Sequence, residues 1–222
     1  IIAISTSRSE LGLQTNLYNE LALSKKIKFI PIITGDNLNN NKFNDIKNIK
    51  SKNLKKIQYN RKYKNNYSLI TSISNIIKIT DFFEKLKPDM IVVMGDRYEI
   101  FYICSIAFIL KIPICHLSGG DSTLGSLDDT FRHSISLMSN LHLVATKSSK
   151  KKLLQLGIKD TSIKIVGEIG LQNINNFKFF NLNDISKKLK VKLTKNIILL
   201  AFHPETLTNN TTFLIKNILK SL

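Results

Sequence analysis

The stretch that decides the fold, residues 94–133, reads MGDRYEIFYICSIAFILKIPICHLSGGDSTLGSLDDTFRH. It contains a helix-like segment over 98–110 and a short apolar strand over 112–117, and another apolar strand over 90–94 leads into it. Apolar strands joined by a helix are typical of parallel pairs that are covered on both faces. Because parallel strands end at one edge of a sheet, we expect the polar residues after both strands to lie together.

Short apolar segments alternate with amphipathic segments over most of the 222 residues. This alternation predicts an α/β fold with a Rossmann-like, doubly wound parallel sheet that helices cover on both faces. We expect strands at 1–4, 27–33, 54–59, 90–94, 112–117, 142–145 and 163–166. We expect helices at 10–23, 68–86, 98–110, 127–138, 147–156 and 184–189, and a loop or a poor helix over 37–56.

A domain boundary is expected near residue 170. Residues 1–170 would form an N-terminal Rossmann-like domain, and residues 171–222 would form the start of a second, incomplete domain. A new apolar strand is expected over 197–202 in that second domain, leading into His203. The apolar run at the first residue and the helical pattern that reaches the last one indicate a fragment of a longer protein.

Acidic residues follow both central strands. Asp96 comes after the first strand, and Asp121 comes after the second, preceded by Gly119 and Gly120. Two glycines let the backbone adopt positive φ or approach a ligand closely. The alternatives are a helix N-cap for Asp96 and a plain turn for the glycine pair. Acids at the ends of two neighbouring strands favour a site.

The next predicted helix begins with Asp128, Asp129, Arg132 and His133. Two acids at this position could simply cap the helix against its dipole. The guanidinium and the imidazole one turn later, however, bring acid and base chemistry to the same place. Facing carboxylates in one cleft raise one another's pKa, which creates a general acid beside a general base.

The segment that follows the first strand, residues 5–10, reads STSRSE. Small hydroxyl residues at a helix N-terminus, together with the guanidinium of Arg8, suit a phosphate group. An ordinary serine N-cap beside a solvated arginine explains the pattern equally well. No GxGxxG motif is present, so the NAD-type fingerprint is absent.

The net charge is +17, from 33 Lys and Arg against 16 Asp and Glu. Such a charge suits nucleic acid or another anionic partner. The lysines, however, are dispersed among Ile and Asn, and no dense basic run carries the aromatics of a single-strand binding groove. We therefore expect a solvated basic surface and no nucleic-acid partner.

Cys104 and Cys115 lie within apolar segments, which predicts buried free thiols and a reducing, cytoplasmic location. No CxxC or HExxH motif occurs, so no metal site is expected. His116 and His142 are expected to be hydrogen-bonded core residues. The sequence shows no signal peptide and no apolar run long enough to cross a bilayer, so no membrane partner is expected.

Longer motifs around these residues resemble those of one enzyme family. They are STSRSELG at 5–12, MGDR at 94–97, HLSGGDSTLGSLDDTFRHSISLMSNLHLVAT at 116–146 and FHPET at 202–206. In order and spacing the sequence resembles the hydrolysing UDP-N-acetylglucosamine 2-epimerases over nearly all of residues 1–206. The resemblance implies a two-domain, GT-B-like architecture with a UDP-sugar in the interdomain cleft, the second domain being truncated here.

The resemblance also implies a reaction. UDP-N-acetylglucosamine and water would give N-acetylmannosamine and UDP through a 2-acetamidoglycal, with no cofactor, for sialic or nonulosonic acid synthesis. A homo-oligomer, either a dimer or a tetramer, is expected. The close alternative is a hydrolysing 2-epimerase of UDP-N,N'-diacetylbacillosamine on the route to legionaminic acid. The remaining alternatives are a GT-B glycosyltransferase and a binder of nucleic acid or anionic surfaces.

Residue roles follow from the resemblance position by position. It implies catalytic roles for Asp96, Asp121, Asp128 and His203, without deciding which carboxylate is the acid and which the base. It implies substrate contacts for Arg8, Glu10, Arg97, Gly119, Gly120, Arg132 and His133. Two positions depart from the family pattern: Ser118 replaces a common Glu, and Gln172 replaces the Asp of Gly-Leu-Asp. The family's later Ser/Gly-rich nucleotide-binding segment is missing, so the fragment alone is expected to be inactive.

Overall fold

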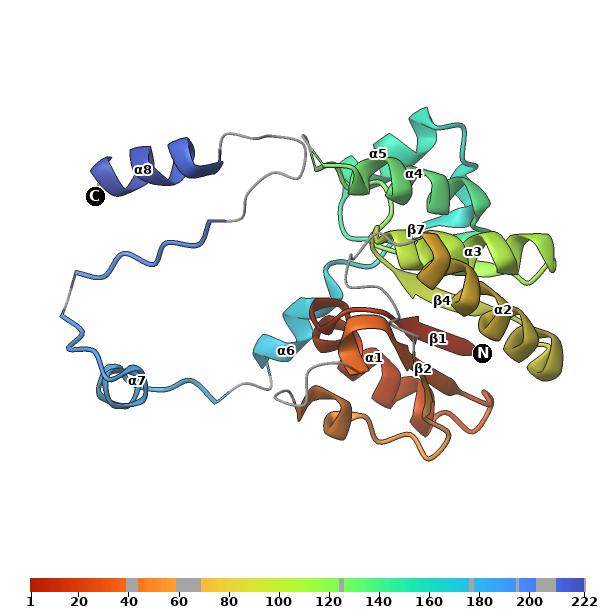
Figure 1. Cartoon of the computed structure of the whole chain (residues 1–222), viewed down its shortest axis with the longest axis horizontal. Coiled ribbons are helices and arrows are strands. Elements are labelled where there is room, and N and C mark those ends of the chain that lie inside the picture. The colour runs from red at the N-terminus through yellow and green to blue at the C-terminus, as the bar shows by residue number, and fades with distance from the viewer. Residues whose placement is uncertain are drawn as a thin grey trace.

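A seven-stranded parallel sheet forms the centre of the computed structural model (Figure 1). The structure describes residues 1–38, 44–58, 69–123, 126–175, 178–194, 196–202 and 211–221. The strands lie in the order β3-β2-β1-β4-β5-β6-β7, and all neighbouring pairs are parallel. They are Ile2–Ser5 (β1), Ile30–Thr34 (β2), Lys55–Ile57 (β3), Ile91–Met94 (β4), Ile114–Leu117 (β5), Leu141–Val144 (β6) and Ile163–Ile165 (β7).

Helices connect the strands at nearly every predicted position. The α-helices are Arg8–Leu23 (α1), Leu69–Leu86 (α2), Tyr98–Ile109 (α3), Asp128–Met138 (α4), Lys147–Gln155 (α5), Gln172–Asn175 (α6), Leu182–Leu189 (α7) and Thr211–Ser221 (α8). Short 3-10 turns cover Gly35–Leu38 (η1), Asn44–Asn48 (η2), Asp160–Ser162 (η3) and Ile169–Leu171 (η4). The end of η1 and all of η2 fall within residues 37–56, for which a loop or a poor helix is predicted.

Both faces of the central strands are buried: every residue of β1, β2, β4 and β5 is buried, and successive strand residues point to opposite sides of the sheet. Ile2 and Ile4 of β1 join a core that α2, α3 and α4 complete. Ala3, between them, joins a second core with Leu11 and Tyr18 of α1. A smaller core packs α5 on β6 and β7. The predicted Rossmann-like, doubly wound parallel sheet is therefore confirmed.

The predicted strand over 197–202 is wrong. These residues form neither helix nor strand, and Ile198 and Leu199 are 78% and 93% exposed. An apolar run becomes a strand only when a neighbouring strand supplies hydrogen bonds and a packed face, and the described part of the chain offers no such neighbour here.

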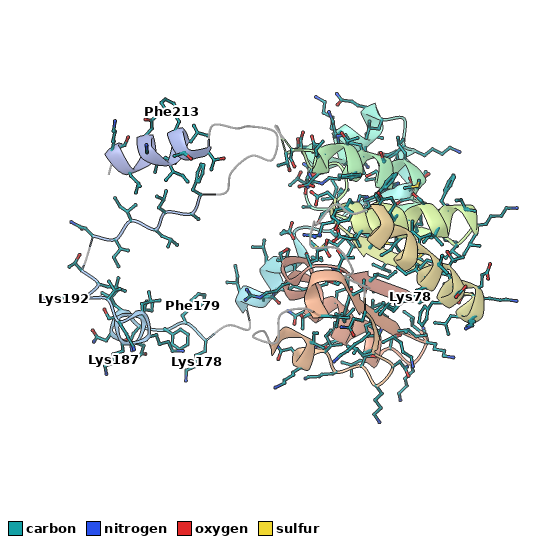
Figure 2. All side chains as sticks on the ribbon, viewed as in Figure 1. Lys78, Lys178, Phe179, Lys187, Lys192 and Phe213 are labelled. Carbon is teal, nitrogen blue, oxygen red and sulfur yellow. The ribbon has the colours of Figure 1, made fainter. Side chains whose placement is uncertain are left out.

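The described residues after 177 lie apart from the sheet. Figure 1 shows α7 and α8 away from the packed strands, and neither helix has a buried residue. Phe179 and Phe213, labelled in Figure 2, are 73% and 63% exposed. By contrast, Asn173 of α6 still contacts α1, since the Asn16 side-chain amide donates to it at 2.7 Å. The boundary near residue 170 and the assignment of 171–222 to a second domain stay predictions.

The structure bears on the predictions about the two cysteines and about helices that could cross a membrane. Cys104 and Cys115 are free thiols buried in the core, as predicted, and burial raises the pKa of Cys115 to about 12. Among the residues that the structure describes, no helix is both long and apolar enough to cross a bilayer.

Gly120, in the turn after β5, packs closely against helix α5. Its φ is +77°, and a Cβ there would collide with the carbonyl oxygen of Ser149. Gly157 has a similar φ of +83°, but nothing lies within 4 Å of its Cβ position. We predict that Gly120→Ala lowers the free energy of unfolding by about 2–5 kcal/mol, whereas Gly157→Ala lowers it by only about 1–2 kcal/mol. Urea unfolding of the two variants measures the difference, and equal losses would contradict the close packing.

Candidate active site

The strand order reverses between β1 and β4, which lie side by side in the sheet. The chain continues from β1 towards β2 on one side and from β4 towards β5 on the other. In open α/β sheets, ligands bind outside the carboxyl ends of the strands at such a switch point. The segment from Thr6 to Arg8 follows β1 there, and Gly95, Asp96 and Arg97 follow β4.

Hydrogen bonds to Gly95 hold the end of β4 against β5. The Gly95 N–H donates to Leu117 O at 3.2 Å, and His116 Nε2 lies 2.8 Å from Gly95 O. The other ring nitrogen of His116 lies 3.0 Å from Ser136 Oγ on α4. Burial lowers the pKa of His116 to about 4, so the ring is neutral and acts as a structural bridge. The prediction of a hydrogen-bonded core residue is confirmed for His116.

An ion pair between Asp96 and Arg132 is the centre of the site. Arg132 Nη2 contacts Asp96 Oδ2 at close range, while Arg132 Nη1 lies 3.4 Å from Thr123 Oγ1 and 3.6 Å from Asp129 Oδ1. Arg132 is only 8% exposed. Burial raises the pKa of Asp96, Arg132 opposes that rise, and the charge of Asp128 adds to it. The structure therefore brings Asp96, Asp128 and Arg132 together, as the sequence predicts.

The two acids at the start of α4 have different surroundings. Asp128 accepts a hydrogen bond from Ser126 Oγ at 2.9 Å. Asp129 instead accepts from the Thr123 N–H at 2.8 Å and from Ser122 Oγ at 3.0 Å. Partial burial works to raise the pKa of Asp129, but these two hydrogen bonds together with nearby His133 and Arg132 lower it overall. Asp129 thus fixes the loop after Asp121, a role that its acidic character alone could not disclose.

Asp121 lies in a different environment from the Asp96 pair. Its Oδ1 accepts a hydrogen bond from Ser149 Oγ of α5 at 2.6 Å. Gly119, which precedes it in the turn, packs so closely that an added Cβ would lie 2.9 Å from both His116 Nδ1 and Ser136 Oγ. The two glycines therefore serve close packing, and the Asp121 side chain is held by α5.

The segment after β1 forms a helix cap. Ser7 is the N-cap of α1, and Glu10 Oε2 accepts from the Thr6 N–H at 2.9 Å, the Ser7 N–H at 3.0 Å and Thr6 Oγ1 at 3.1 Å. This reciprocal arrangement is a capping box. Burial raises the pKa of Glu10 to about 7, although the bonds from Thr6 and Ser7 oppose the rise. Glu10 Oε1 is buried and has no hydrogen-bond partner in the described part of the chain.

Arg97 and Arg8 lie at the starts of α3 and α1. Arg97 donates to Glu99 through Nε at 3.1 Å and through Nη2 at 2.9 Å, which is a bidentate pair. Glu99 is not among the residues singled out from the sequence. An acid two residues after an arginine at the start of a helix is the pattern that could have indicated this pair. Arg8 is exposed in the first turn of α1. His133 Nδ1 is buried without a partner among the described residues.

Comparison with known proteins decides the family. The family profile described as UDP-N-acetylglucosamine 2-epimerase matches residues 19–222. The chain belongs to this family. The resemblance read from its motifs is therefore confirmed.

Several relatives in the 2-epimerase family are similar over almost the whole chain. The GDP/UDP-N,N'-diacetylbacillosamine 2-epimerase (hydrolyzing) of Campylobacter jejuni is 39% identical over 226 residues, covering 100% of this chain and 59% of that protein. The UDP-N,N'-diacetylbacillosamine 2-epimerase (hydrolyzing) of Legionella pneumophila is 31% identical, covering 92% of this chain and 55% of that protein. The chain thus spans a little over half the length of the curated relatives it matches.

Solved structures of 2-epimerases share the fold. The UDP-N-acetylglucosamine 2-epimerase from Rickettsia bellii superposes with a TM-score of 0.72 at 20% identity, covering 86% of this chain and 51% of that one. The enzyme from Neisseria meningitidis bound to UDP-GlcNAc gives a TM-score of 0.66 at 24% identity, covering 85% and 52%. At this level of identity the likeness establishes the fold of the 2-epimerases for this chain.

Three further residues singled out from the sequence are Ser118, His142 and His203. Ser118, where a Glu is common in the family, has a left-handed φ of +58°, and its N–H donates to Leu143 O at 3.0 Å. His142 is buried as predicted; burial lowers its pKa, and an interaction with the Ser139 backbone opposes that shift. His203 lies outside the described residues, and its catalytic role stays a prediction.

The buried carboxyl of Glu10 makes stability depend on pH. Its pKa is near 7 in the folded protein and about 4.5 when unfolded, so the folded state binds the proton more tightly. This contribution is fully present below pH 4.5 and is lost as the pH rises through 7. We predict that Glu10→Gln, which keeps an acceptor for the cap, gains stability relative to the wild type by on the order of 3 kcal/mol across that range. Chemical unfolding of both proteins between pH 4.5 and 8 measures the difference, and a constant offset would contradict it.

Proposed function

We propose that the complete gene product containing this chain is a hydrolysing UDP-sugar 2-epimerase. Two observations support the proposal: membership of the 2-epimerase family, and the cluster of Asp96, Asp128 and Arg132 at the switch point. The cluster carries the reaction because C2 epimerisation needs one group that removes a proton and another that returns one.

The chemistry proceeds in two stages. In the first, a base removes the C2 proton while the C1–O bond to the diphosphate breaks, which leaves a C1=C2 double bond and free UDP. In the second, water supplies a hydroxyl to C1 and an acid delivers a proton to C2 from the opposite face. Asp96 and Asp128 share the proton-transfer work, and Arg132 holds Asp96 in place while it gains or loses a proton.

For the substrate, we favour UDP-N,N'-diacetylbacillosamine over UDP-N-acetylglucosamine. The relatives from Campylobacter jejuni and Legionella pneumophila are named for that sugar and cover 100% and 92% of this chain. The UDP-N-acetylglucosamine 2-epimerase of Neisseria meningitidis serogroup B is 30% identical over only 60% of it. UDP-N-acetylglucosamine remains the second substrate to test.

Turnover in deuterated water tests the proposed reaction. We predict that the complete gene product converts one of the two UDP-sugars into UDP and a free 2-epimerised sugar with deuterium at C2, as followed by NMR. A sugar transferred to an acceptor, with no deuterium at C2, would indicate a glycosyltransferase instead. Lack of reaction with both UDP-sugars would refute the epimerase assignment.

Substitution of the two clustered carboxylates tests their roles. We predict that Asp96→Asn and Asp128→Asn each lower kcat by about 10²–10⁴-fold, because each removes a proton-transfer group. Asp160→Asn is the matched control, since Asp160 is 65% exposed and pairs with Lys150 at 2.6 Å on the surface of α5. It should leave kcat unchanged. Circular dichroism checks that all three variants fold, and near-normal kcat in folded Asp96→Asn and Asp128→Asn would refute the roles.

A further inference from the structure

The first turn of α5 touches the turn that carries Asp121. Gly120 packs against the carbonyl oxygen of Ser149 and the side chain of Leu153, so closely that only glycine fits. Ser149 itself is 3% exposed. The backbone next to Asp121 is therefore seated on α5, a helix that begins after a different strand from the one that leads to Asp121.

Hydroxyl groups of α5 then reach the carboxylate. Ser149 Oγ lies 2.6 Å from Asp121 Oδ1 and 2.6 Å from Thr146 Oγ1, and the Ser149 N–H donates to Thr146 Oγ1 at 3.0 Å. A carboxylate only accepts, so the single Ser149 hydroxyl proton goes to Asp121. The proton between the two hydroxyls must then come from Thr146. The chain of donors runs in one direction and ends on Asp121.

The position of Ser149 in its helix shows that this hydroxyl is not needed by α5 itself. Thr146 is the N-cap, and it already accepts from the Ser149 N–H. In a capping box, the side chain at this third position turns back to the N-cap backbone, as Glu10 does in α1. Ser149 turns to Asp121 instead. Within the described residues, Oδ1 of Asp121 has this hydrogen bond and Oδ2 has none.

We propose that Ser149, oriented by Thr146, is a positioning residue that fixes the Asp121 carboxylate for reaction and leaves Oδ2 to face the sugar. This role rests on the proposed function and on the catalytic role that the family resemblance implies for Asp121. Ser149 does not touch the substrate, and it works by holding Asp121 in one rotamer. Loss of such a hold displaces a reacting group, and misplacement by about 1 Å costs up to about 10²-fold in rate.

The test compares Ser149→Ala with two matched variants in the complete gene product. Ser149→Thr keeps the hydroxyl. Ser105→Ala removes a hydroxyl that donates to the Phe101 carbonyl oxygen of its own helix at 2.9 Å, away from the site. We expect Ser149→Ala to lower kcat about tenfold with KM within threefold of wild type, and Ser149→Thr to restore most of kcat. Ser105→Ala should match the wild type.

The outcomes separate the positioning role from a purely structural one. Thermal unfolding should shift by less than about 10 °C for Ser149→Ala, because the two hydrogen bonds of the Ser149 hydroxyl are lost. A kcat of Ser149→Ala within twofold of wild type would overturn the proposal, as would an equal loss in Ser149→Thr or in Ser105→Ala. If the wild type releases no UDP from either UDP-sugar, the proposed function has failed. If the wild type is active and Ser149→Ala matches it, only the positioning role has failed.

Discussion

The site depends on the ion pair between Asp96 and Arg132. Arg132 is only 8% exposed, and a buried charge requires partners with good geometry. Asp96 supplies the main one, with Thr123 and Asp129 beside it. This requirement presses the start of α4 against the end of β4, although the paired residues are 36 positions apart. Asp128 lies at the start of the same helix as Arg132, so the contact between Arg132 and Asp96 also brings Asp128 close to Asp96.

Much of the fold could be predicted from the sequence because apolar runs of four or five residues specify buried parallel strands. The strands expected at 90–94 and 112–117 are Ile91–Met94 and Ile114–Leu117 in the structure. The run over 197–202 is equally apolar, but it forms no strand and residues 197–201 are exposed. Composition gives a segment its tendency to form a strand, whereas a strand exists only where a neighbour pairs with it.

The site could be predicted as a set of residues but not as a set of contacts. Asp96, Asp128 and Arg132 are found together because strand ends and helix starts share one edge of the sheet. The residues that hydrogen-bond to the site residues could not be predicted. Glu99 for Arg97 and Ser149 for Asp121 are set by side-chain packing, which short-range patterns do not encode. Glu10 is buried as part of the cap of α1, which its acidic type alone does not disclose, and its expected substrate contact stays a prediction.

Local surroundings outweigh the net charge in setting the state of the site carboxyls. A protein with a net charge of +17 favours ionised acids everywhere, and its field attracts an anionic sugar nucleotide. Even so, burial and the nearby charge of Asp128 raise the pKa of Asp96 against that field and against Arg132. Asp129 has a lowered pKa, because hydrogen bonds from Thr123 and Ser122, with His133 and Arg132 nearby, favour its charged form against the effect of burial. Desolvation and hydrogen bonding, not overall charge, therefore shift the pKa values of Asp96 and Asp129 in opposite directions.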